Sequence, residues 1–212
     1  MNADAARHAF HSAASGFVEL VGEIPPDAWS RPGLGIWDVR ALVGHTARGL
    51  STIESYLGAA TSLPPVEGPV GYYLRALSDD ADAEARAARD AAIAARGREA
   101  GEALGGDPPA FVGDLARRVE ALVARTPDDT PVASPAGRMT LADYLPTRTF
   151  ELTVHSLDLA RALGVNPPAV LAGAVTACCE LAGALAGRRP QAPDLLLLMT
   201  GRQDLPPRLS VL

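Results

Sequence analysis

The stretch RTFELTVHSLDLARALG (residues 148–164) constrains the fold more than any other part of the chain. Apolar residues recur in it at intervals of three and four, which predicts an amphipathic helix that ends at Gly164. A polar stripe runs between the apolar rows and consists of Arg148, Glu151, His155 and Asp158. At about 100° per residue, these side chains fall within roughly 80° of one another on the helix surface.

The pair Glu151 and His155 makes this stripe chemically unusual. A spacing of four residues places the carboxylate and the imidazole one turn apart on the same face, beside Phe150 and Leu152. Both groups are costly to bury without partners. The pattern therefore leaves three explanations, which are an ion pair, a catalytic couple or a metal site.

The composition favours an all-α protein. Apolar residues make up 48% of the 212-residue chain but aromatic residues only 5%, so alanine, leucine and valine carry the hydrophobicity, and alanine is the best helix former. The long amphipathic segments predict a four-helix bundle with little or no strand, in which residues 58–106 form a crossover connection. We expect residues 1–165 to form this bundle and residues 166–212 to form a helical extension and tail packed on it.

Charge and cysteine content exclude several classes of protein. A net charge of −6 argues against non-specific nucleic-acid binding. The adjacent Cys178 and Cys179 rarely bridge, so no disulfide framework is expected. The N-terminus resembles no signal peptide, and residues 195–199, identified as the longest strongly apolar run, are too few to span a bilayer. We expect a cytoplasmic protein without a membrane partner.

Several local signals predict how the helices begin and pack. Asp38 is expected to cap a second helix, and residues 140–143 resemble a capping box with Asp143 in place of glutamate. Pro146 predicts a kink or a restart just before Arg148. Residues 72–104 are rich in alanine, arginine and aspartate and predict a solvated, weakly packed helix or a broken pair of helices. Residues 110–125 predict a helix whose apolar stripe consists of Phe111, Leu115, Val119 and Leu122.

One further histidine stands where it can face the Glu151–His155 pair. His45 lies in the second turn of the predicted second helix, and bundles build metal sites from side chains on facing helices. Two imidazoles and a carboxylate match a catalytic zinc site, which uses three protein ligands and keeps an open position. The alternative is a Glu151–His155 pair within the helix, with His45 as a hydrogen-bonded core residue.

Other candidate residues carry weaker signals. Trp37, at the start of the second helix, is either a core plug or the wall of a pocket. His8 and His11 lie three apart on the first helix, but the sequence places no acidic partner nearby, so they are expected to be solvated surface residues.

Two stretches resemble the mycothiol-dependent maleylpyruvate isomerase family, a branch of the DinB-like metal-binding bundles. The first is GIWDVRALVGH, which ends at His45, and the second is RTFELTVHSLDLARALG, which contains Glu151 and His155. With the helices between them, the resemblance covers about residues 5–165. After Gly164 the chain shows no clear strand pairs, whereas the isomerases proper carry a fuller C-terminal α/β segment.

The resemblance implies a DinB-like bundle that holds a divalent metal through His45, Glu151 and His155. Zinc is the usual ion, and nickel or another metal is also compatible. The resemblance also implies mycothiol as the cosubstrate, in an actinobacterial cytoplasm. Arg148, Asp158 and Trp37 are expected to support the metal ligands or to contact the substrate.

These features predict a metal-dependent S-transferase or a maleylpyruvate-isomerase-like enzyme. A metal-bound thiol is deprotonated, so its thiolate would attack a small electrophile. The thiol and the electrophile are the expected partners of a monomer or homodimer. Two alternatives stay open: a non-catalytic metal- or ligand-binding bundle that acts as a sensor or interaction module, and a scaffold that has lost its metal.

Overall fold

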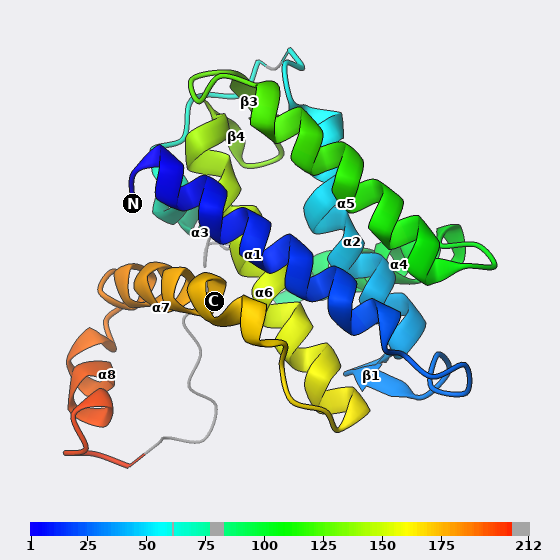
Figure 1. Cartoon of the computed structure of the whole chain (residues 1–212). Helices are drawn as coiled ribbons and strands as arrows, with labels where there is room; N and C mark the ends of the chain where they lie inside the picture. The colour runs from blue at the N-terminus through cyan, green and yellow to red at the C-terminus, as the bar shows by residue number, and fades with distance from the viewer. Residues whose placement is uncertain (61, 77–82, 205–212) are drawn as a thin grey trace.

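The computed structural model of the chain describes residues 1–60, 62–76 and 83–204, and the irregular end expected for the tail lies partly outside them. Four long helices supply most of the main apolar core. They are α1 (Ala3–Gly22), α2 (Val39–Tyr56), α5 (Pro108–Arg125) and α6 (Leu141–Leu163). Figure 1 shows these four helices packed side by side, with each of α1 and α2 in contact with both α5 and α6. The prediction of an all-α bundle is confirmed.

The crossover between α2 and α5 contains α3 (Gly68–Ala76) and α4 (Ala83–Ala103), which confirms the broken pair. The expectation of weak packing is wrong for α4, because this helix lies directly against α2. A Cβ atom built on Gly44 of α2 would lie 2.2 Å from the backbone nitrogen of Gly101. The charge-rich surface of α4 therefore hides a narrow face of small residues that lets two backbones approach closely.

This close approach makes Gly44 a sensitive position. Gly44→Ala should lower the free energy of unfolding by about 1–3 kcal/mol, because the new methyl group would collide with the backbone of α4. Gly113→Ala on α5 is the matched control, because a Cβ there meets nothing within 4 Å. This control should stabilise the protein by about 0.5–1 kcal/mol through helix propensity. Urea unfolding followed by circular dichroism measures both, and equal effects would contradict the close α2–α4 contact.

Two short hairpins are the strands that the structure describes before residue 165, which agrees with the expectation of little strand. Strand β1 (Pro32–Leu34) pairs with β2 (Trp37–Asp38), and β3 (Pro131–Ser134) pairs with β4 (Gly137–Thr140), both antiparallel. Strands this short hold too few residues to show an alternating pattern, so the sequence indicated only loops. Each hairpin leads directly into a helix, β2 into α2 and β4 into α6.

The predicted caps fix where these two helices begin. The Asp38 carboxylate accepts a hydrogen bond from the backbone nitrogen of Ala41 at 2.8 Å, and the Thr140 hydroxyl accepts one from that of Asp143 at 3.2 Å. Helix α6 then runs unbroken through Pro146, so the chain does not restart before Arg148. Gly164 ends the helix in the left-handed conformation, with φ of 71°, as predicted.

The apolar face of α5 differs by one residue from the predicted stripe at each end. Leu115 and Val119 are buried as expected, but Val112 and Val123 take the places assigned to Phe111 and Leu122. The Phe111 ring is 41% exposed. The bundle therefore leaves a large aromatic side chain on its surface.

Beyond α6 lie a 3₁₀ turn (Ala169–Leu171), α7 (Ala172–Ala186) and α8 (Ala192–Met199). Helix α7 packs on α1 and α6, whereas α8 lies beyond α7 and away from the bundle (Figure 1). Within the described residues, Ala169–Ala186 is long and apolar enough to cross a bilayer by length and composition, with a mean hydropathy of 1.8. It is a longer apolar stretch than residues 195–199. One such helix is weak evidence for a membrane span, because helices of soluble proteins pass the same test.

Candidate metal centre

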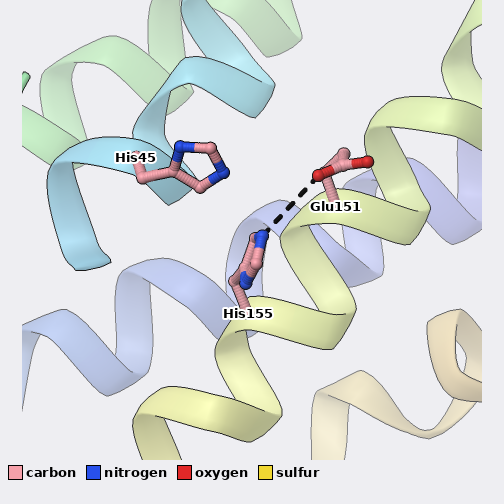
Figure 2. Close-up of side chains that lie close together, drawn as sticks. All are labelled: His45, Glu151 and His155. Carbon is pink, nitrogen blue, oxygen red and sulfur yellow. Dashed lines mark ion pairs between the residues drawn. The ribbon is translucent and has the colours of Figure 1, made fainter. Parts of the chain in front are cut away.

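Helices α2 and α6 bring the three predicted ligands together. One ligand atom each from His45, Glu151 and His155 lies within 4.8 Å of the other two. Figure 2 shows the His45 ring on α2 facing the other two side chains, which lie one turn apart on α6. The donor set, two imidazoles and one carboxylate, is that of many divalent-metal sites.

His155 lies between two carboxylates. Its Nε2 atom is 3.6 Å from Oε2 of Glu151, the pair joined by the dashed line in Figure 2, and its Nδ1 atom is 3.2 Å from Oδ2 of Asp158. Burial alone would lower the pKa of His155, but the hydrogen bonds to the two carboxylates outweigh it and raise the pKa to about 9. Burial opposes the charge of Glu151 as well, yet His155 and Arg148 hold the pKa of Glu151 near 2.

His45 behaves differently. Burial, reinforced by the charge of His155, lowers its pKa to about 4, so the ring is neutral at pH 7. Its Nδ1 atom is buried and has no hydrogen-bond partner. The alternative of a hydrogen-bonded core histidine does not explain this unpaired nitrogen, whose burial is costly. A neutral imidazole beside a carboxylate and a second imidazole fits a metal ligand set.

One protein-family model matches most of the chain. The model of the mycothiol maleylpyruvate isomerase N-terminal domain matches residues 10–160, which include all three candidate ligands. The chain belongs to this family. No match was found among the curated proteins or among the solved structures. The match ends within α6 and leaves α7 and α8 outside it.

Trp37 takes the role of a core residue that contacts His45. Its ring stacks on His45 with the ring centroids 4.4 Å apart, and it is only 9% exposed. Its indole nitrogen donates a hydrogen bond to the carbonyl of Ala94 on α4 at 3.0 Å. Gly97 leaves room for the ring, since a Cβ there would lie 2.6 Å from it. Trp37 is therefore a core residue whose ring packs against His45, and its role toward a substrate stays a prediction.

Tyr73 is a site residue that the sequence reasoning missed. Its hydroxyl lies 2.9 Å from Oε1 of Glu151 and 3.1 Å from the carbonyl of Thr147. The two carboxylate oxygens of Glu151 thus have different neighbours, Tyr73 on one side and His155 on the other. Tyr73 belongs to α3, in a stretch that was expected to be solvated, so no local pattern pointed to it.

Arg148 is buried, with only 7% of its surface exposed. It forms no ion pair with Glu151 or Asp158 in the part of the chain that the structure describes. It donates instead to the Tyr72 hydroxyl at 3.0 Å, and its guanidinium carbon lies 4.8 Å from the centre of the Tyr144 ring. It lines a cavity of about 140 Å³ together with His45, Glu151 and these two tyrosines.

The histidines of α1 lie outside the candidate centre. Among the described residues, the cluster with metal-like spacing contains neither His8 nor His11. The His11 side chain is 63% exposed, as expected for a surface residue. The expectation that it has no acidic partner is wrong, because its Nδ1 lies 2.7 Å from Oε1 of Glu120 on α5.

The raised pKa of His155 predicts how the metal-free protein responds to pH. A folded-state pKa of about 9 against an ordinary value of 6.5 means that protonated His155 stabilises the fold fully below pH 6.5. That stabilisation is lost as the pH rises through 9. The melting temperature of chelator-treated protein should therefore fall between pH 6.5 and 9. His155→Gln, which does not titrate, should remove this fall, and an identical pH profile in the variant would contradict the assignment.

The contact between Tyr73 and Glu151 predicts an effect on metal affinity. Tyr73→Phe removes only the hydroxyl that orients the carboxylate, and should weaken zinc binding by about tenfold or more. Tyr72→Phe is the matched control, because its hydroxyl contacts Arg148 and none of the three candidate ligands. Competition with a chromophoric chelator measures both affinities. The same loss in both variants would show that Tyr73 has no special part in orienting Glu151.

Proposed function

We propose that this protein is a metal-dependent S-transferase or isomerase that uses mycothiol. The observation that carries the proposal is the convergence of His45, Glu151 and His155 from two facing helices. Membership of the mycothiol maleylpyruvate isomerase family supports the choice of thiol, and with it a cytoplasmic setting.

His45, Glu151 and His155 would hold the metal. Three protein ligands of these types are the usual set of a catalytic zinc site, and imidazole nitrogens also accept nickel and other divalent ions. When bound, the metal lowers the pKa of a coordinated thiol, so that the nucleophilic thiolate exists at neutral pH.

The neighbouring residues orient these three side chains. Asp158 contacts the second ring nitrogen of His155, an arrangement that fixes the orientation of a ligating histidine. Tyr73 holds one oxygen of Glu151, and Trp37 packs against the His45 ring. A histidine binds a metal in its neutral form. His155, which is protonated between Glu151 and Asp158, must therefore release its imidazolium proton when the metal binds.

The small cavity beside the cluster suits the electrophile. The Arg148 guanidinium is buried and forms no ion pair with a carboxylate among the described residues, so it can attract an anionic group. We place a carboxylate of the substrate against Arg148, with the tyrosine rings as walls. In conjugation, a carbon–sulfur bond forms while the bond to a leaving group breaks and the thiol proton is released. In isomerisation, the thiol adds across a double bond, the resulting single bond rotates, and elimination returns the thiol.

Metal content and thiol transfer test this proposal together. His155→Ala should lose the metal and all thiol transfer while keeping its helical circular dichroism signal, because the apolar core is unchanged. His11→Ala is the control and should retain both. The assays are elemental analysis of purified protein and turnover of mycothiol with a panel of small electrophiles, including maleylpyruvate.

The outcomes separate the proposed enzyme from its alternatives. Full metal content in His155→Ala would overturn the ligand assignment. Metal binding without thiol turnover in the wild-type protein would favour a non-catalytic binding module. A wild-type protein that binds no metal would favour a scaffold.

A further inference from the structure

A second hollow lies next to the candidate centre. It is a groove of about 380 Å³ between α2, α4 and α5. Small residues of α2 and α4 leave the space open, and Phe111 of α5 lines it with a ring that is 41% exposed. Its charged lining residues are Arg48, Glu54, Arg96, Glu99 and Arg118.

Arg48 connects this groove to the metal centre. It lines both the groove and the small cavity that contains His45 and Glu151. Gly44, the residue before His45, also lines the groove.

The cavity at Arg148 and the groove differ in volume, and therefore in the size of ligand that each can hold. Pockets that enclose a whole drug-sized ligand measure about 300–1,000 Å³. The cavity at Arg148, at about 140 Å³, is below that range and suits only a small substrate, whereas the groove at about 380 Å³ is within it. A thiol that brings its sulfur to the metal must therefore place the rest of its body elsewhere, and the adjoining groove has the room.

The chemistry of the groove favours a neutral, hydroxyl-rich ligand. Three arginines are set against two glutamates, one of which already pairs with Arg118, so the groove lacks the strong positive charge that a polyanion needs. Hydroxyl groups both donate and accept hydrogen bonds, so they can use guanidinium and carboxylate groups alike. The Phe111 ring adds an apolar platform against which the carbon face of a sugar can pack.

We propose that the groove between α2, α4 and α5 binds the sugar and inositol body of mycothiol, with Phe111 and Arg96 as contact residues and Arg48 at the junction with the metal centre. This inference rests on the proposed function, because it takes mycothiol as the thiol that reaches the metal. Mycothiol carries its N-acetylcysteine on an amino sugar joined to inositol, so the sulfur end and the polyol end can be tested separately.

The test compares mycothiol with N-acetylcysteine, which has the thiol but no sugar or inositol. Calorimetric titration of the zinc-loaded full chain gives the dissociation constant of each. Phe111→Ala and Arg96→Gln should each weaken mycothiol binding by about tenfold and leave both the N-acetylcysteine affinity and the zinc content unchanged. Arg98→Gln is the matched control, since Arg98 is an exposed arginine on the same helix that does not line the groove.

Each result decides one question. Unchanged mycothiol affinity in both groove variants would overturn the groove as its binding site while leaving the proposed function intact. Equal weakening of both thiols would show that the substitutions act on the metal end, and would also overturn the inference. If wild-type protein with zinc bound mycothiol no more tightly than N-acetylcysteine, the body of the thiol would have no site here. No binding of either thiol would overturn the proposed function itself.

Discussion

The burial of Glu151 and His155 between α6 and its neighbours is the constraint on which the rest of the site depends. A charged pair in this position is tolerable only because partners surround it, with Asp158 on one side and Tyr73 on the other. His45 completes the group from the facing helix and brings a nitrogen that has no partner of its own. The protein therefore concentrates three costly polar groups at one point between α2 and α6.

The two helices that carry the candidate ligands, α2 and α6, begin in the same way. Each ligand-bearing helix follows a short hairpin and starts at a side-chain cap, Asp38 for α2 and Thr140 for α6. A capped start fixes which residues face inward along the whole helix, because the rotation per residue is constant. His45 lies two turns from one cap, and Glu151 three turns from the other, so the caps determine the height at which the ligands meet.

The parts of the site that the sequence could predict are those encoded within one helix. The four-residue spacing of Glu151 and His155 and the stop at Gly164 are local signals, and the structure contains both features. The position of Tyr73 and the close contact of α4 depend on which segments meet in space. A charge-rich stretch carries no sequence pattern that indicates which helix it packs against. Phe111 was misassigned because apolar periodicity cannot distinguish a core position from the exposed edge one residue away.

The contact between Leu171 and Gly16 bears on how this chain can be divided. A Cβ atom on Gly16 would lie 2.4 Å from Leu171, so the leucine occupies a notch in α1 that only glycine leaves open. The family match ends at residue 160, yet the leucine that fills this notch comes later in the chain. A chain truncated at residue 160 would lack Leu171 and would leave the space beside Gly16 on α1 unfilled. The residues that the family match covers therefore leave out a side chain against which α1 packs.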